Sequence, residues 1–142
     1  MNNVSSLLSR KNRPVVAVTP QTSVVDALTV MAEKNIGCVV VLEGNKYLGI
    51  FTERDYSRKV ILKGKHSSTT AVSEIMSTDL TAAALNDSIE YCMEIMTSKN
   101  IRYMPVFEND QLTGIVSMSD VVKETILAQK ETIDQLQSYI QS

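Results

Sequence analysis

The sequence has few of the residues that build catalytic or metal centres. It contains no tryptophan, a single histidine (His66) and two cysteines (Cys38 and Cys92), which lie far apart in apolar stretches. A zinc site or a cysteine–histidine catalytic pair needs several such residues at defined spacings, so both are excluded. We therefore expect a non-catalytic protein that needs no metal for its fold.

The chain also lacks a surplus of positive charge and any long apolar run. Fourteen basic residues stand against sixteen acidic ones, for a formal net charge of -2, so nucleic acid is not an expected partner. No segment approaches the roughly 18 apolar residues of a membrane span, and the N-terminus lacks the apolar core of a signal peptide. With 142 residues, 44% of them hydrophobic, we expect a globular, cytoplasmic protein.

What the sequence does contain is an internal repeat. Lys34-Asn35-Ile36 returns 65 residues later as Lys99-Asn100-Ile101, and the match continues without a gap from residue 23 to residue 62. Residues 4–9 match residues 72–77 at a shift of 68 instead. This change indicates that three residues were gained or lost between the two matches.

Each repeat predicts the same order of elements. After a short helical turn, an extended segment (residues 15–18 in the first repeat) leads to a helix capped by Ser23, or by Ser88 in the second repeat. A buried strand, a two-residue turn and a returning strand follow, and a final helix ends the repeat. The predicted turns are Gly44-Asn45 and Asn109-Asp110.

These elements predict an α/β (α+β) fold. One βαββα repeat is too small to bury a good core alone, so we expect two repeats packed sheet to sheet with pseudo-two-fold symmetry and a cleft between them. The predicted division is a first domain at residues 4–62, a polar linker at 63–71, a second domain at 72–127 and a helical tail at 128–142.

One short motif occurs in both repeats, where the returning strand leads into the final helix. It reads Gly-apolar-x-(Thr or Ser)-x-x-Asp, and we call Gly49–Asp55 the first motif and Gly114–Asp120 the second motif. With this doubled pattern the chain resembles the CBS-domain family, from Val4 to about Leu127. The segments Glu53-Arg54-Asp55-Tyr56 and Arg58-Lys59-Val60 are similar to those of small stand-alone bacterial CBS-pair proteins.

The resemblance implies a tandem CBS-domain pair that binds an adenine nucleotide, with AMP, ATP or NAD(H) as candidates. In that use Asp55 and Asp120 would accept hydrogen bonds from ribose hydroxyls, and Thr52 and Ser117 would lie near phosphate at a helix N-terminus. A different interpretation needs no ligand, because Thr-x-x-Asp and Ser-x-x-Asp also resemble a capping box with Asp in place of Glu. Both roles can coexist.

Three arginines add positive charge near these motifs. Arg54 lies within the first motif and Arg58 lies shortly after it. Arg102 stands where the first repeat has Gly37. Arginine suits bidentate contact with phosphate, although each could equally be a solvated surface residue. The set favours a phosphorylated ligand over S-adenosylmethionine.

The second repeat also carries the segment that lines adenine in the resembled family, Tyr103-Met104-Pro105. The first repeat has Cys38 and Val40 where the second has Tyr103 and Pro105. We therefore predict at least one occupied site and not necessarily two, with Cys38 serving in core packing.

After the second motif the helical pattern continues to the end of the chain. It places Ile126, Ile133 and Ile140 at position a of a heptad, with Val122, Gln129 and Leu136 at position d. Isoleucine at a and leucine at d favour a parallel two-stranded pairing, which would reinforce a homodimer. The alternative is a helix packed on its own domain.

Three functions compete on these observations. The first is a nucleotide sensor without catalytic activity, which signals to a protein effector that the sequence does not identify. The second is a dimerisation scaffold that binds no ligand and uses its motifs only as helix caps. The third is an enzyme acting on the nucleotide. Such an enzyme would need an activated nucleophile, a perturbed acid or a metal cluster, and the sequence shows none of these.

Overall fold

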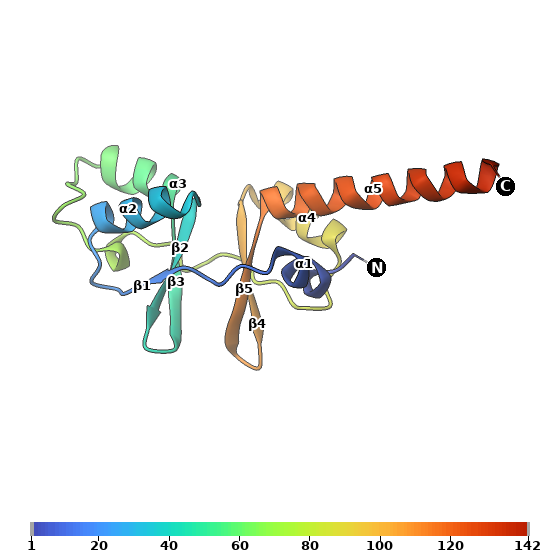
Figure 1. The fold of residues 1–142 in the computed structure, drawn as a ribbon. Coiled ribbons are helices and arrows are strands. Elements are labelled where there is room, and N and C mark those ends of the chain that lie inside the picture. The colour runs from blue at the N-terminus through green and yellow to red at the C-terminus, as the bar shows by residue number, and fades with distance from the viewer. Residues whose placement is uncertain (1, 142) are drawn as a thin grey trace. The chain divides into compact units, whose positions relative to one another are not determined.

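The computed structural model describes residues 2–141 of the chain, which form two compact units (Figure 1). Pro14–Asp79 make one unit, which we call the first-motif unit because it contains Gly49–Asp55. The second-motif unit joins residues 80–141 to the N-terminal residues 2–13. The compact units thus regroup the sequence repeats: the N-terminal helix belongs with the second repeat, and residues 72–79 stay with the first.

The first-motif unit is a three-stranded sheet with helices. The sheet order is β1-β2-β3, in which β1 runs parallel and β3 antiparallel to β2. A hydrophobic core joins α2, β2 and β3 to the segment after the sheet, through Val24, Phe51, Val60 and Val72 among others. Its elements are β1 (Ala17–Val18), α2 (Val24–Lys34), β2 (Cys38–Glu43), β3 (Lys46–Thr52), α3 (Glu53–Asp55), η1 (Tyr56–Ile61) and η2 (Val72–Glu74).

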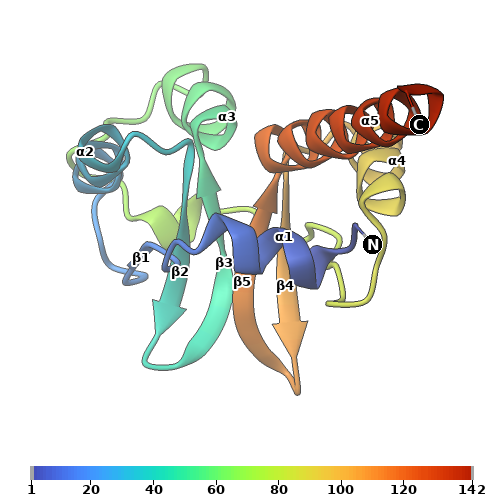
Figure 2. The ribbon, with the colours of Figure 1, turned by 45° about the vertical axis from the view of Figure 1, so that its right-hand side comes forward.

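The second-motif unit repeats this order around a β-hairpin. β4 and β5 pair antiparallel, and a single parallel bridge between Ala83 and Val106 stands where β1 pairs with β2 in the other unit. Figure 2 shows α1 in front of the hairpin, and α1 contacts both β5 and α5. Its elements are α1 (Val4–Lys11), α4 (Ile89–Lys99), β4 (Tyr103–Glu108), β5 (Gln111–Ser117) and α5 (Met118–Gln141).

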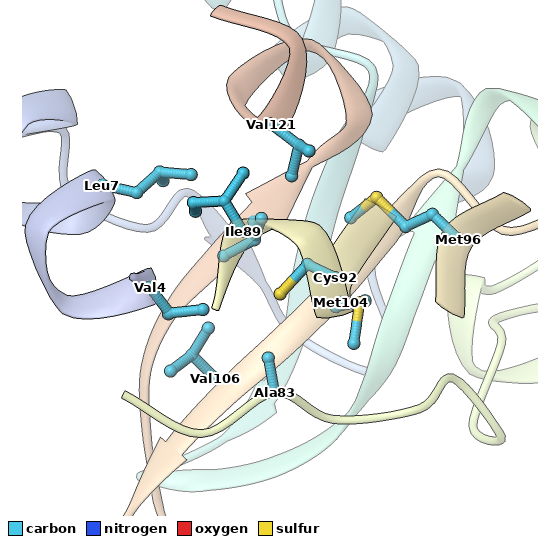
Figure 3. Close-up of a cluster of buried hydrophobic side chains, with 10 residues drawn as sticks. Val4, Leu7, Ala83, Ile89, Cys92, Met96, Met104, Val106 and Val121 are labelled. Atoms are coloured by element: carbon cyan, nitrogen blue, oxygen red, sulfur yellow. The ribbon is translucent and has the colours of Figure 1, made fainter. Parts of the chain in front are cut away.

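The N-terminal helix α1 belongs to this unit because its apolar face completes the core. Val4 and Leu7 are 0% and 2% exposed and lie with side chains from α4, β4 and α5 (Figure 3). The amides of Val4 and Ser5 donate to the carbonyls of Asp87 and Leu85, both at 2.9 Å. Fully burying side chains of this size stabilises by about 1.5–3 kcal/mol each, so α1 is an integral part of the unit.

A proline explains why the second-motif unit has a bridge in place of a third strand. In the first-motif unit the amide of Val40 donates to the carbonyl of Val16 at 2.9 Å, which pairs β2 with the segment leading into β1. Pro105 stands at the equivalent position of β4 and has no N–H to donate. Only its carbonyl is used, accepting from Ala83 at 2.8 Å.

Asparagine ends the equivalent helix in each unit. Asn35 after α2 and Asn100 after α4 adopt left-handed conformations, with φ of 55° and 54°. The next amide, of Ile36 or Ile101, then donates back to Met31 or Met96 at 3.0 Å. This 6→1 bond satisfies a terminal carbonyl, and asparagine is one of the few residues besides glycine that adopts this conformation readily.

The final helices of the two units differ. Sequence periodicity predicted a regular helix after each motif, but in the first-motif unit α3 is three residues long and continues as the π-helical η1. In the second-motif unit α5 runs unbroken for 24 residues, as the pattern predicted. Residues 129–141 are all exposed, so the alternative of a tail packed on its own domain is wrong. In the described residues, no helix is long and apolar enough to cross a membrane.

Candidate functional site

The first motif forms a closed network around Asp55. One carboxylate oxygen, Oδ2, accepts from the amide and hydroxyl of Thr52, both at 3.0 Å. The other, Oδ1, accepts from the Ser77 hydroxyl at 2.8 Å and pairs with the Lys59 ammonium at 2.9 Å. Asp55 is 4% exposed, so its carboxylate is buried with both oxygens fully used.

The second motif is more open. Oδ2 of Asp120 accepts from the amide of Ser117 at 2.9 Å and pairs with Lys11, the last residue of α1, at 2.8 Å. Oδ1 has no donor among the residues the structure describes, and the side chain of Asp120 is 15% exposed. This carboxylate therefore keeps one oxygen available for a further hydrogen bond.

The two hydroxyls differ in the same way. Each accepts from the amide of its motif aspartate at 3.1 Å, which caps the following helix. The proton of the Thr52 hydroxyl is then used on Asp55, whereas the Ser117 hydroxyl donates to nothing in the described part of the chain. Both motifs thus form the reciprocal hydrogen bonds of a capping box, as the ligand-free interpretation predicted, and they differ in the hydroxyl proton.

Backbone amides at the two helix starts are mostly occupied. The amide of Glu53 donates to the carbonyl of Gly37 at 3.2 Å, and the amide of Met118 donates to the carbonyl of Arg102 at 2.8 Å. Because the first and third amides of each helix have partners, an incoming phosphate would find the second, at Ser119 in α5. The predicted phosphate site at a helix N-terminus therefore depends on one amide and the nearby side chains.

The three predicted arginines do not gather at one motif. Arg54 is half-buried on α3, Arg58 is exposed on η1, and both belong to the first-motif unit. Arg102 is exposed immediately before β4 in the second-motif unit, where its carbonyl receives the Met118 amide. Among the three, only Arg102 lies in the same unit as the open carboxylate of Asp120.

One predicted adenine contact is a core residue. The side chain of Met104 is 0% exposed and lies with Cys92, Met96 and Ala83 in the core of the second-motif unit (Figure 3). Its neighbours Tyr103 and Pro105 have the opposite orientation, because successive strand residues alternate between the two faces of the sheet. The side chain of Met104 therefore cannot line a ligand, and only its backbone can take part in the predicted adenine contact.

Sequence reasoning missed the charged residues that hold the two aspartates. In the first-motif unit Lys59 pairs with Asp55 and donates to the carbonyl of Ile75 at 3.1 Å. In the second-motif unit Lys11 pairs with Asp120 and donates to the carbonyl of Ile115, also at 3.1 Å. The two lysines make the same pair of contacts, although one lies on the motif's own helix and the other on α1.

Cys92 is a packing residue in the core of the second-motif unit, whereas Cys38 is half-buried. Burial raises the pKa of the Cys92 thiol to about 11, with a smaller contribution from the charge of Asp87, so it is protonated at neutral pH. A buried, protonated thiol is a poor nucleophile and metal ligand. Within residues 2–141, no group of three or more metal-ligating side chains comes together.

Comparison with known proteins identifies the family. The CBS domain matches residues 4–61 and 72–126, which is more than half of the chain. The chain belongs to the CBS-domain family. The predicted α/β fold of two βαββα repeats is thereby confirmed, together with the resemblance on which it rested.

The chain is similar in sequence to two curated relatives and in structure to two solved CBS proteins. It is 35% identical over 128 residues to the CBS domain-containing protein CBSX3, mitochondrial, of Arabidopsis thaliana, covering 87% of this chain and 62% of that protein. It is 30% identical over 118 residues to the CBS domain-containing protein YhcV of Bacillus subtilis, covering 83% and 84%. The CBS-domain containing protein ATU1752 from Agrobacterium tumefaciens superimposes with a TM-score of 0.81 at 40% identity, over 87% of this chain and 92% of that one.

The second structure contains ligands. The CBS domain pair of protein MJ0100, in complex with 5′-methylthioadenosine and S-adenosyl-L-methionine, superimposes with a TM-score of 0.77 over 92% of this chain and 98% of that one. Its identity to this CBS pair is 21%, so this match supports the fold alone.

Proposed function

We propose that this CBS pair is a non-catalytic regulatory module that binds an adenine nucleotide at its second motif and signals the binding to a protein effector. The observation that carries the proposal is the contrast between the two aspartates. Asp120 keeps a carboxylate oxygen without a donor and is partly accessible, whereas both oxygens of the buried Asp55 are used. The second motif is the working site, and the first motif is a structural cap.

The groups around Asp120 suit the parts of a nucleotide. A ribose hydroxyl would donate to Oδ1 of Asp120, and phosphate would accept from the Ser117 hydroxyl and the Ser119 amide. Arg102 and Lys11 supply positive charge in the same unit. Tyr103, half-buried on the face of β4 opposite the core, offers apolar surface for the base, and Pro105 lies buried on the same face.

One solved structure with the same fold contains adenosyl ligands. The MJ0100 pair holds two adenosyl compounds, so a CBS pair of this fold accommodates adenosine. Because arginine and lysine accompany the second motif, a phosphorylated ligand is favoured here, namely AMP, ATP or NAD(H). S-adenosylmethionine carries no phosphate and would leave these charges unused.

A thermal-shift experiment tests this proposal. Melting temperatures of the wild type, Asp120→Ala and Asp55→Ala are measured with AMP, ATP, NAD⁺, NADH and S-adenosylmethionine. A ligand at 100 times its dissociation constant adds about 2.7 kcal/mol of stability. We expect this increase in the wild type and in Asp55→Ala but not in Asp120→Ala. No increase with any of the five compounds would refute nucleotide binding.

A second candidate function is self-association through α5. Its stripe of Val122, Ile126, Ile133, Leu136 and Ile140 is 42–80% exposed, and its heptad spacing matches the Ile-at-a, Leu-at-d arrangement of parallel two-stranded coiled coils. A second copy of the same chain presents an identical stripe, so it is the partner that this pattern fits. Homodimerisation is compatible with nucleotide binding, and on its own it would make the protein a scaffold.

A further inference from the structure

A short stretch of the first-motif unit, residues 58–66, concentrates positive charge on the surface. Between residues 56 and 73 the chain has four of its fourteen basic residues and no acidic one, although acidic residues outnumber basic ones in the whole sequence. One of the four, Lys59, is used on the buried Asp55. We call residues 58–66 the basic segment. Its exposed cationic side chains are Arg58, Lys63 and Lys65.

The protein itself hardly neutralises these exposed charges. Within residues 2–141, Arg58 and Lys63 have no ion-pair partner. Lys65 approaches Glu74 only to 4.0 Å, and the two side chains are 44% and 52% exposed. An ion pair as exposed as this contributes little to stability. The basic segment therefore presents a positive field to the solvent, which favours an anionic partner.

The CBS repeat does not require this charge. At the shift of 65 residues, Ala128 and Gln129 stand where the basic segment has Lys63 and Gly64, and they lie inside the continuous helix α5. In the first repeat the chain turns away at Gly64 instead, with φ of 69°. The positive charge of this turn is thus a feature of the first repeat alone.

Two large apolar side chains project from the middle of the same segment. Ile61 is 56% exposed and Leu62 is 76% exposed, whereas the adjacent Val60 is 0% exposed and belongs to the core. The main chain around them is hydrogen-bonded, because the amide of Leu62 donates to the carbonyl of Ser57 at 3.2 Å and the amide of Lys65 donates to the carbonyl of Val60 at 2.9 Å. An ordered backbone, anchored by Val60, therefore holds two apolar side chains in solvent.

The spacing of these two residues favours a lipid surface over a groove in a protein. Consecutive residues of a helix do not share a face, and a groove that receives a helix reads apolar anchors three or four residues apart. In the basic segment the positions three and four residues after Ile61 are Gly64 and Lys65. A bilayer surface makes no such demand on direction, and anionic lipid attracts the lysines beside the apolar pair.

We propose that the basic segment is a docking surface for an anionic lipid bilayer. Ile61 and Leu62 enter the boundary between head groups and acyl chains, while Arg58, Lys63 and Lys65 lie at the level of the lipid phosphates. Each basic residue near such a surface strengthens binding about fivefold. The contact is weak and reversible, because stable attachment takes more than one signal of this kind. It lies in the first-motif unit and does not depend on nucleotide binding at the second motif.

Co-sedimentation with lipid vesicles tests this surface. The full chain is mixed with vesicles of phosphatidylcholine alone, and with vesicles of phosphatidylcholine and phosphatidylglycerol in equal amounts, at low and at physiological ionic strength. The charge variant combines Lys63→Gln with Lys65→Gln. The apolar variant combines Ile61→Ser with Leu62→Ser.

Matched controls change exposed residues of the same kinds elsewhere in the first-motif unit. Lys34→Gln combined with Lys46→Gln removes two exposed lysines, and Val25→Ser removes an apolar side chain that is 39% exposed. Melting temperatures establish that every variant remains folded, which is expected because none of the changed side chains is buried.

We expect the wild type and both controls to sediment with the anionic vesicles and not with phosphatidylcholine alone, more completely at low ionic strength. The charge variant loses two cations and should bind the anionic vesicles about 25-fold more weakly. The apolar variant should bind them about tenfold more weakly or less, because it loses the buried hydrocarbon of two side chains.

Three results would overturn the proposal. If the wild type does not sediment with anionic vesicles, the positive charge fits an acidic protein instead. If the apolar variant binds as tightly as the wild type, charge alone attracts the protein and Ile61 and Leu62 do not enter the lipid. If sedimentation equilibrium without lipid gives a lower mass for the apolar variant than for the wild type, the apolar pair belongs to a contact between two copies of the chain.

Discussion

The carbonyl oxygen of Ser77 lies against Gly49 so closely that no other residue fits there. A Cβ at Gly49 would lie 2.7 Å from this oxygen and 3.0 Å from the sulfur of Met76. Main-chain hydrogen bonds in both directions between Ile50 and Ser77, at 2.9 and 2.8 Å, hold the two segments together. The glycine of the first motif is thus required by the segment that follows the first repeat.

Gly49→Ala should therefore destabilise the protein, whereas Gly114→Ala should have little effect. At Gly114 the nearest atoms to an added Cβ are the methyl carbons of Leu8, at 3.0 and 3.1 Å. A leucine side chain can rotate away, but the backbone at Ser77 cannot move without breaking its hydrogen bonds. We expect a loss of about 1–3 kcal/mol for Gly49→Ala and under about 1 kcal/mol for Gly114→Ala, measured by urea denaturation. Similar losses in both variants would contradict this contrast.

Replacing the two motif aspartates should reduce the stability of the protein by different amounts. Asp55→Ala removes a buried acceptor of four bonds and leaves Lys59 and Ser77 without their partner, so we expect a loss of about 2–4 kcal/mol. Asp120→Ala loses a helix cap and a partly exposed ion pair, which together are worth about 1–2 kcal/mol. Denaturant titration of the two variants without ligand measures this difference. A larger loss for Asp120→Ala would contradict the assignment of Asp55 as the structural residue.

Local patterns predicted most of this fold. Helix caps at Ser23 and Ser88, the turn at Gly44-Asn45 and the repeated Lys-Asn-Ile segments depend on neighbours in sequence, so the elements could be placed from the sequence within a few residues. The Asn109-Asp110 turn is equally local, since both residues take positive φ, 52° and 63°, as a two-residue hairpin of this type requires.

Long-range pairing could not be read in this way. The sequence of residues 4–11 does not indicate that they pack on β5 and α5, more than 100 residues later. Their apolar face would suit the core of either unit. The open carboxylate of Asp120 likewise depends on Lys11 arriving from α1. At the shift of 65 residues the second repeat has the acidic Glu124 where the first repeat has the basic Lys59. A position-by-position comparison of the repeats would have found this difference in charge.

Stability should fall at alkaline pH because of Cys92. Burial raises the pKa of its thiol from 9.0 to about 11, so the unfolded state releases this proton at lower pH than the folded state. The associated stability is fully present below about pH 9 and is lost as the pH rises toward 11. Tyr47, whose pKa burial raises to about 12, acts in the same direction at higher pH.

Chemical denaturation of the wild type and Cys92→Ala at pH 8 and pH 10.5 measures this effect. Other titrating groups are common to both proteins and cancel in the comparison. The alanine variant is less stable at pH 8, because it loses a buried side chain, but we expect its disadvantage to shrink at pH 10.5. A difference that is independent of pH would show that the thiol does not titrate differently on folding.

Self-association through α5 can be tested at a single position of its exposed stripe. Ile133 occupies the central a position and is 54% exposed, and in a parallel pair it would face its own copy, so Ile133→Asp places two like charges in the interface. Sedimentation equilibrium should give twice the mass of one chain for the wild type and a single-chain mass for Ile133→Asp. Ser138→Asp adds the same charge at exposed position f, away from the stripe, and should remain dimeric. Equal masses for all three proteins would show that α5 does not hold two chains together, and the stripe would then require a partner other than a second copy.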